Sequence, residues 1–414
     1  MPPVVMYAAL STGGVVHLAF LYPQLKKLTG AQRLILQLAG ATVAAGVPVS
    51  LVTHRIADEV RPFLPPGVAL VETGRRVDRV GRHYADAALE YALAPSLIAH
   101  IPQGMTAAIL FGPPMMPALP WARQRGGWGG AGKPLLAFLY EPPRFVDRDR
   151  ADVAAGLGAA GPLLAPLFAL YRPMDAALVR VADGLLANGI YGAARLRAAY
   201  GRDAAVVPHG VDLPGPEAVA VAAVRGQYNI PANAPLVLSV NQLHPRKRLD
   251  LFVRVLAAVR QSVPGAHGVL VGRGVDEGRL RVEAQMRDVT DALTFAGFVP
   301  DADLAALYGA ASVYLHTGRD ETFGLSVLEA AWFGTPIVAA DEGGPREILR
   351  ADPSALVPAT VDALADGVLS VLHHPNIARA RADAVRADVH GRYSWAAGAT
   401  ALIAAVEHAS RTMP

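Results

Sequence analysis

The pattern that most constrains the fold lies in the last third of the chain, where two apolar runs flank a helix-forming segment. The first run covers residues 312–315 and the second covers 337–340, and both have the composition of buried strands. A polar loop leads into good helix formers at 325–333, and Gly334 follows where a helix end favours glycine. Strand, helix and strand in this order predict a βαβ unit of a parallel sheet.

Two glutamates flank the predicted helix start. Glu321 precedes the helix and Glu329 lies within it, with seven residues between them and Gly324 in the loop. A helix N-terminus presents unpaired N–H groups and a positive dipole end, so a phosphate suits this point. Each carboxylate can accept hydrogen bonds from sugar hydroxyls. The plain alternative is a pair of solvated surface glutamates, but the Gly-Gly-Pro-Arg-Glu segment at 343–347 favours a binding site.

This stretch resembles the signature of the retaining glycosyltransferases of family 4, which have the GT-B fold. The resemblance is strongest from 235 to 348. It implies an α/β protein with two Rossmann-like domains facing across a cleft and a C-terminal helix crossing back to the first domain. It also implies that a nucleotide-sugar donor binds the second domain, with Glu321 at the donor sugar and Glu329 at the ribose hydroxyls.

Length and composition agree with a two-domain protein. A chain of 414 residues can form two cores. We expect an N-terminal acceptor domain at 1–208, with 391–414 packing back on it, and a C-terminal donor domain at 209–390. The formal net charge of +3 gives no reason to expect nucleic-acid binding. The absence of cysteine excludes disulfides, thiol catalysis and Cys-ligated metal.

The sequence also bears on location. It contains no run of 18 uncharged apolar residues, and its N-terminus lacks a basic leader, so we expect neither a transmembrane helix nor a signal peptide. We therefore expect a cytoplasmic protein. Residues 112–133 place Trp121 and Trp128 among Gly, Pro, Arg and Lys, which leaves two interpretations open. One is a mobile loop over the acceptor cleft, and the other is a peripheral contact with the inner face of the membrane.

The first half of the chain predicts a second sheet of the same kind. A helix at 34–45 follows a turn at Gly30, which resembles a degraded form of the family's Gly-Gly-Ala-Glu motif. This resemblance places Gly30 on the acceptor side. Strands are expected at 15–21, 47–53, 68–71, 107–111 and 135–140.

The segment Phe-Leu-Tyr-Glu-Pro-Pro-Arg at 138–144 resembles the Tyr-Cys-His-x-Pro-x-Arg segment of mannosyltransferase-like members of the family. Tyr140 stands where those members usually have an active-site histidine. A phenol can donate a hydrogen bond to a sugar hydroxyl, but it is a poor base near neutral pH. We take Tyr140 as a catalytic candidate and Arg144 as an acceptor-side candidate. His209, a lone imidazole, is expected to have a structural or surface role.

A basic loop follows the strand expected at 235–240. The carboxyl end of a parallel strand is where an anion binds, and cations there stabilise the charge of a leaving diphosphate. The family pattern is Arg-x(4)-Lys. Lys247 matches the lysine and is a catalytic candidate, whereas Gln242 stands at the arginine position. Arg246 or Arg248 could restore the missing charge, and Gln242 and Arg246 are donor-binding candidates.

The rest of the expected donor site lies on loops and a helix start of the same domain. Gly272 follows a strand at 268–271, in a Gly-Arg-Gly turn that lets a nucleotide approach the backbone. The resemblance places the backbone near Phe298 and Val299 at the base. The helix start contributes Thr322, Phe323, Gly324 and Leu325.

Together these residues predict a retaining transfer of a hexose from a nucleotide-sugar to a glycan, a glycolipid or a small hydroxyl acceptor. The resemblance at 138–144 and 241–248 favours GDP-mannose, with a UDP-sugar open. No metal or other cofactor is expected, since Lys247 and the helix dipole can neutralise the diphosphate. The resemblance implies a front-face mechanism in which the leaving phosphate helps to deprotonate the acceptor. The alternatives are a catalytically inactive sugar-nucleotide-binding protein and a GT-B epimerase.

Overall fold

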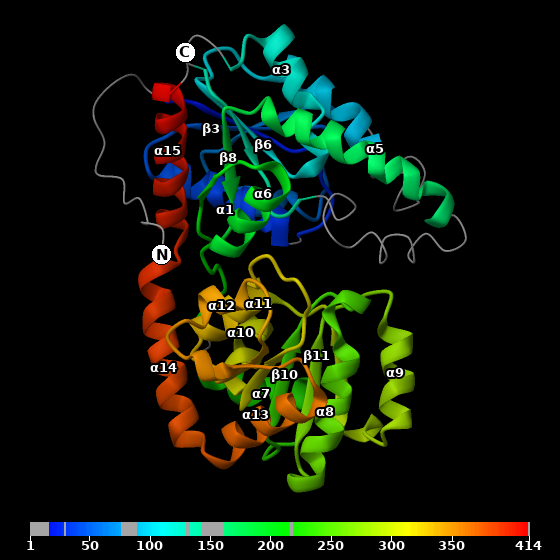
Figure 1. Cartoon of the computed structure of the whole chain (residues 1–414). Helices are drawn as coiled ribbons and strands as arrows, with labels where there is room; N and C mark the ends of the chain where they lie inside the picture. Colours follow the sequence, from blue (N-terminus) through cyan, green and yellow to red (C-terminus); the bar gives the residue numbers. More distant parts are fainter. Residues whose placement is uncertain are drawn as a thin grey trace. The chain divides into compact units, whose positions relative to one another are not determined.

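A computed structural model of the chain describes residues 16–28, 30–75, 89–129, 133–142, 161–215 and 218–412. The chain divides into two compact units (Figure 1). The first consists of Met1–Gly210 and Ser394–Pro414, and the second is Val211–Tyr393. The sequence placed the two boundaries after residues 208 and 390, so each lies a few residues further along the chain in the structure.

A seven-stranded parallel sheet forms the centre of the first unit, in the order β5-β3-β1-β6-β7-β8-β9. Its strands are β1 (Leu18–Leu21), β3 (Val49–Thr53), β5 (Ala69–Glu72), β6 (Ala107–Phe111), β7 (Leu135–Phe138), β8 (Gly184–Ala187) and β9 (Ala204–Val206). A separate pair joins β2 (Gln24–Leu25) and β4 (Arg55–Ile56).

Helices cover this sheet, and the sheet is apolar on both faces. Leu18 and Phe20 of β1 join one core cluster, whereas Ala19 and Leu21 join the other. Such a strand is apolar throughout because alternate side chains enter different cores. The helical elements are α1 (Gly30–Ala44), η1 (Arg61–Phe63), η2 (Ala94–His100), η3 (Pro113–Met115), α3 (Ala118–Gly126), α5 (Gly161–Arg180), α6 (Ile190–Tyr200) and α15 (Trp395–Thr412).

The last helix, α15, belongs to the first unit. Leu402 and Val406 of α15 share a core cluster with Leu34 and Leu38 of α1. A core that begins with residues near the N-terminus is therefore completed by residues from the C-terminal end of the chain. Figure 1 shows α15 beside the first unit. This confirms the predicted return of the C-terminal helix.

The interpretation of 112–133 as a mobile loop was wrong. Helix α3 occupies much of this segment, and Leu119 and Trp128 lie in a core cluster. Apolar packing overrides the Gly- and Pro-rich composition. Trp121 remains 43% exposed, with the Arg125 guanidinium carbon 4.2 Å from its ring centre. Among the described residues, no helix has the length and apolarity needed to cross a membrane. Peripheral membrane contact stays a prediction.

A six-stranded parallel sheet forms the second unit, in the order β12-β11-β10-β13-β14-β15. Its strands are β10 (Leu236–Val240), β11 (His267–Val271), β12 (Leu293–Gly297), β13 (Val313–His316), β14 (Ile337–Ala340) and β15 (Leu356–Val357). Its helical elements are α7 (Ala218–Gln227), η5 (Pro245–Lys247), α8 (Leu249–Ser262), α9 (Glu277–Met286), η6 (Thr290–Ala292), α10 (Asp301–Ala310), α11 (Leu325–Trp332), α12 (Pro345–Ile348), η7 (Pro353–Ala355), α13 (Val361–His373) and α14 (Pro375–Arg392).

Because all six strands run in the same direction, their carboxyl ends meet at one edge of the sheet. The loops that follow β10, β11, β12, β13 and β14 all start at this edge. Most of the residues predicted to bind the donor belong to these loops.

Candidate functional site

Glycines bring the loops after β10 and β11 into backbone contact. Gly272 has φ +123°, and a β-carbon there would lie 2.0 Å from the main-chain oxygen of Asn241. A β-carbon on Gly274 would lie 2.0 Å from the oxygen of Leu243. The Asn241 N–H donates to the Val271 oxygen at 2.9 Å, so the two loops are also hydrogen-bonded. Only glycine fits at positions 272 and 274 in this arrangement.

A second pair of glycines fixes the loop that carries Glu321. A β-carbon on Gly343 would lie 2.5 Å from the main-chain oxygen of Glu321, and one on Gly344 would lie 2.4 Å from the α-carbon of Phe323. The Gly344 N–H donates to the Glu321 oxygen at 2.7 Å. The Gly-Gly pair after β14 therefore holds the backbone of the loop after β13.

Lys247 and Glu321, which are 74 residues apart, form an ion pair at this edge. Their side chains are only 15% and 12% exposed. Burial by itself would raise the pKa of Glu321, but the Lys247 ammonium outweighs it, with further contributions from His316 and Arg246, and the pKa falls to about 2. Glu321 is therefore ionised at neutral pH. The predicted site residues Lys247 and Glu321 are brought together, although the sequence had assigned them to different parts of the donor.

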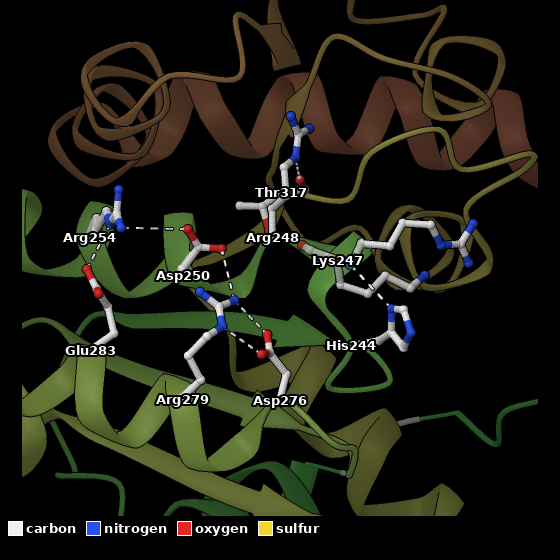
Figure 2. Close-up of polar contacts among 10 residues, drawn as sticks. His244, Lys247, Arg248, Asp250, Arg254, Asp276, Arg279, Glu283 and Thr317 are labelled. Carbon is white, nitrogen blue, oxygen red and sulfur yellow. Dashed lines mark hydrogen bonds and ion pairs between the residues drawn. The ribbon is translucent and has the colours of Figure 1, made fainter. Parts of the chain in front are cut away.

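Arg248 fixes the same loop and is not available to a diphosphate. It has φ +47°. Its guanidinium donates to the Thr317 oxygen at 2.8 Å, to the Gly318 oxygen at 3.4 Å and to Glu342 Oε1 at 3.1 Å. Thr317 in turn donates its hydroxyl to the Lys247 oxygen at 2.8 Å. Figure 2 shows the contact between the Arg248 guanidinium and Thr317. Of the two arginines expected to replace the missing family arginine, Arg248 is engaged by these oxygens, and the role of Arg246 stays a prediction.

The neighbouring arginines on α8 and α9 are neutralised by carboxylates. Arg279 donates to both oxygens of Asp276 at 2.7 Å, and Arg254 donates to Glu283 at 2.8 Å (Figure 2). Asp250 lies between the two arginines, 3.5 Å from Arg279 and 3.9 Å from Arg254. The nearby carboxylates raise the pKa of the Arg279 guanidinium. Arg254 and Arg279 are therefore engaged by carboxylates of their own helices and loops, whereas Lys247 pairs with Glu321 at the sheet edge.

Helix α11 begins beside Glu321. Gly324 caps it with φ +98°, and its oxygen accepts hydrogen bonds from Val327 and Leu328. Thr322 and Leu325 are half-buried. The Phe323 side chain is 2% exposed and packs edge-on against the Tyr393 ring, so only its backbone can face a ligand.

A buried tyrosine holds the Glu329 side chain in place through a hydrogen bond. The Tyr308 hydroxyl donates to Glu329 Oε2 at 2.8 Å, and burial raises the pKa of Tyr308 well above 10. A second buried tyrosine, Tyr314, donates to the Ser326 hydroxyl at 2.7 Å on the same turn of α11. These contacts orient the carboxylate predicted to meet the ribose.

The other predicted donor residues differ in exposure. Gln242 is exposed on the loop after β10, and Phe298 is 70% exposed after β12. Val299 is 3% exposed and belongs to a core cluster, so any contact with a base would come from its backbone.

Tyr140 and Gly30 lie in the first unit. The Tyr140 hydroxyl is buried and has no hydrogen-bond partner among the described residues, and burial raises its pKa well above 10. This hydroxyl stays protonated, so Tyr140 cannot act as a base near neutral pH. Gly30 is exposed at the first position of α1. Arg144 lies outside the described residues. His209 is buried next to the Trp395 ring, and burial lowers its pKa to about 3.

Sequence reasoning missed His316, Thr317 and Tyr308. His316 and Thr317 are fully buried at the end of β13. A polar residue at the carboxyl end of a buried parallel strand is a usable signal, and His316 carries it. The sequence around Tyr308 carries no such signal, because a tyrosine at this helical position is typical of an ordinary core residue. Among the described residues, no group of three or more His, Asp or Glu could hold a metal ion.

Two parallel α/β sheets, with a C-terminal helix that returns to the first unit, define a protein of the GT-B class. The chain resembles sucrose-phosphate synthase from Thermosynechococcus elongatus with a TM-score of 0.72 at 21% identity, covering 95% of this chain and 98% of the other. It resembles HepE of Anabaena, solved with UDP and glucose, with a TM-score of 0.70 at 18% identity, covering 95% and 100%. At these identities the likeness concerns the fold alone.

Sequence comparisons identify the family. Residues 221–388 match the model of glycosyl transferases group 1. The chain is 30% identical over 284 residues to the GDP-mannose-dependent alpha-(1-6)-phosphatidylinositol monomannoside mannosyltransferase of Mycobacterium tuberculosis, covering 65% of this chain and 72% of that protein. It is 32% identical over 250 residues to the D-inositol 3-phosphate glycosyltransferase of Segniliparus rotundus, covering 56% of this chain and 54%, about half, of that protein's length. The chain belongs to the group 1 glycosyltransferases, family 4.

Proposed function

We propose that this protein is a retaining glycosyltransferase that moves a sugar from a nucleotide-sugar donor to a hydroxyl acceptor. The Lys247–Glu321 pair carries the proposal. It places a cation and an ionised carboxylate, both largely buried, at the carboxyl edge of a parallel sheet. The start of α11 lies next to them. This combination suits a ligand that has both a diphosphate and sugar hydroxyls.

In the proposed reaction, the bond between the anomeric carbon and the β-phosphate oxygen breaks, and the electron pair leaves with the phosphate. Lys247 and the N–H groups at the start of α11 stabilise the negative charge that develops there. The acceptor oxygen attacks from the same face and its proton passes to the departing phosphate. Glu321 accepts hydrogen bonds from the donor sugar and holds it in place.

The state of Tyr140 supports this route for the proton. Because burial keeps its phenol protonated, Tyr140 can donate or accept a hydrogen bond but cannot deprotonate the acceptor. The resemblance to the family implies that the leaving phosphate acts as the base, and the protonated state of Tyr140 agrees with this. Without a ligand, Glu321 is ionised because of Lys247, which suits it to accept hydrogen bonds rather than to act as an acid.

GDP-mannose is the donor we propose first, with a UDP-sugar as the alternative. The name of the Mycobacterium tuberculosis relative specifies GDP-mannose. The names of that relative and of the Segniliparus rotundus relative both specify an acceptor that contains inositol. An inositol-bearing glycolipid or a soluble inositol phosphate is therefore the first acceptor class to test, among the glycan, glycolipid and small hydroxyl acceptors.

The alternative is a catalytically inactive sugar-nucleotide-binding protein. Gln242 stands at the position of the family arginine, and Tyr140 stands at that of the histidine. Arg248 is bound to backbone oxygens, which weakens the case that it replaces the missing arginine at a diphosphate. This alternative predicts nucleotide binding without transfer and without slow hydrolysis of the donor.

Calorimetric titration of GDP, UDP and ADP tests the site. We expect one nucleotide to bind clearly more tightly than the others, and Lys247→Ala and Glu329→Ala to weaken it by about 1–3 kcal/mol, the cost of leaving a polar group without its partner. Arg254→Ala is the matched control, because it also removes one positive charge from this unit but breaks only the pair with Glu283 and Asp250.

Two outcomes separate the possibilities. Binding without turnover of GDP-mannose or UDP-glucose, with or without inositol acceptors, would favour the inactive protein. No binding of any nucleotide, or equal weakening by Arg254→Ala and Lys247→Ala, would refute the site.

A further inference from the structure

His316 is a buried polar residue that the proposed reaction does not yet use. It is the last residue of β13 and has no exposed surface. Neither Nδ1 nor Nε2 of its ring has a hydrogen-bond partner among the described residues. A buried polar group without a partner costs free energy, so a histidine at this position requires a reason.

The ring of His316 and the side chain of Glu321 both lie close to Gly318. A β-carbon on Gly318 would lie 3.0 Å from both Nε2 and Cε1 of His316 and 3.3 Å from Cγ of Glu321. Glycine at 318 therefore keeps open the space between the two side chains. The loop cannot easily shift, because Arg248 binds the oxygens of Thr317 and Gly318.

The imidazole is neutral at pH 7 and has one N–H to donate. Burial lowers its pKa to about 4, and the charged groups that face it are Glu321, Lys247 and Arg248. Its carboxylate neighbour, Glu321, is bound to Lys247. Under the proposed function, however, Lys247 has to face the diphosphate. Glu321 would then be a buried carboxylate that has lost its main partner, which is costly unless another donor replaces it.

Resting on that function, we propose that His316 is a positioning residue for Glu321. When Lys247 turns to the donor diphosphate, the His316 imidazole N–H donates to the Glu321 carboxylate. This hydrogen bond keeps Glu321 ionised and directed at the donor sugar. In the structure Lys247 contacts Oε1 of Glu321, and His316 has no hydrogen-bond partner among the described residues.

A second histidine of the same sheet provides a matched control. His267, the first residue of β11, is also buried, but its Nε2 lies 2.9 Å from the Thr294 hydroxyl. It lies at the opposite end of its strand from the loops of the site. His316→Phe removes two nitrogens without partners, whereas His267→Phe removes a hydrogen bond. We expect His316→Phe to melt no lower than the wild type and His267→Phe to melt lower.

The kinetic test uses GDP and GDP-mannose, or UDP and UDP-glucose if UDP binds more tightly. We expect His316→Phe to change nucleotide affinity less than threefold and KM for the donor little, but to lower kcat at least tenfold. In the plot of kcat against pH for His316→Phe, the acid limb should shift to higher pH by at least one unit, because Glu321 in the complex then protonates more easily. His316→Gln, which keeps a donor, should recover most of kcat. His267→Phe should leave kcat and the acid limb unchanged.

A folded His316→Phe with wild-type kcat and a wild-type acid limb would overturn this inference alone. If His316→Phe does not fold, the inference is tested instead by nitrogen NMR of the histidine rings. The His316 signals are assigned as those missing in the spectrum of His316→Gln. We expect one His316 ring nitrogen to shift when GDP is added, and an unchanged spectrum would overturn the inference. A wild type that neither binds a nucleoside diphosphate nor turns over a donor would instead refute the proposed function, and this inference with it.

Discussion

Gly344→Ala tests whether the Gly-Gly segment after β14 positions Glu321. Gly344 has φ −62°, so alanine can adopt its backbone conformation and the effect is purely steric. The new β-carbon would lie 2.4 Å from the Phe323 α-carbon and 2.5 Å from the Phe323 oxygen, whereas ordinary contacts of a β-carbon begin at 3.4 Å. Backbone must therefore move by about 1 Å, and the hydrogen bond from the Gly344 N–H to Glu321 is lengthened or lost.

A displacement of about 1 Å in a positioning residue can lower the rate by about 100-fold, which corresponds to roughly 2.7 kcal/mol of transition-state stabilisation. Overpacking of this kind also costs about 1–3 kcal/mol of folding stability. We expect kcat/KM for the sugar donor to fall by about 100-fold in a variant that is still folded at 25 °C. The assay is release of nucleoside diphosphate from GDP-mannose or UDP-glucose, with melting followed by circular dichroism.

Gly391→Ala is the control, because a β-carbon there would meet no atom within 4 Å and the residue lies inside α14. It should stabilise the protein by about 0.5–1 kcal/mol and leave kcat/KM unchanged. If Gly344→Ala keeps kcat/KM within twofold of the wild type, the Gly-Gly segment does not position Glu321 and the reasoning fails.

Three further predictions concern titration and buried hydroxyls. Glu321 has a pKa of about 2 in the fold instead of 4.5, so it contributes on the order of 3 kcal/mol above pH 4.5 that is lost as the pH falls to 2. Urea midpoints of the wild type and Glu321→Gln should converge over that range, and parallel curves would contradict this. His209 has a pKa of about 3 instead of 6.5 because it is buried, so its contribution is complete above pH 6.5 and is lost toward pH 3. His209→Phe should flatten the pH dependence of the melting temperature in that window, and an equal slope would exclude the effect. Tyr140→Phe removes a buried hydroxyl without a partner among the described residues and should stay within about 0.5 kcal/mol of wild-type stability, as measured by urea unfolding. A clear loss of stability would reveal a contact of that hydroxyl.

The sheets were the most predictable part of the fold. The strands expected at 107–111 and 337–340 match β6 and β14 residue for residue. Fully buried parallel strands are apolar throughout and end at glycine, proline or polar loops, so their limits are visible in the sequence. Helix α3 was missed because its composition is that of a loop, and it forms because Leu119 and neighbouring apolar residues enter a core.

The candidate site was predictable in its residues but not in its contacts. Lys247 and Glu321 were both named from local patterns, yet their ion pair joins segments 74 residues apart. The role of Arg248 could not be inferred, because its partners are backbone oxygens of the loop after β13. The hydrogen bond from Tyr308 to Glu329 likewise depends on how α10 packs beside α11. Side-chain type is encoded locally, whereas pairing across a sheet edge is a property of the folded unit.

The position of α15 has a consequence for synthesis on the ribosome. The first unit needs Leu402, Val406 and their neighbours to complete the core that lies over α1, but these residues are translated only after all of Val211–Tyr393. At about 5–20 residues per second, the nascent first unit waits roughly 10–40 s with that apolar face uncovered. The second unit has no such delay, because its residues are contiguous. The N-terminal unit, although it is translated first, can therefore complete its core only after the second unit has been made.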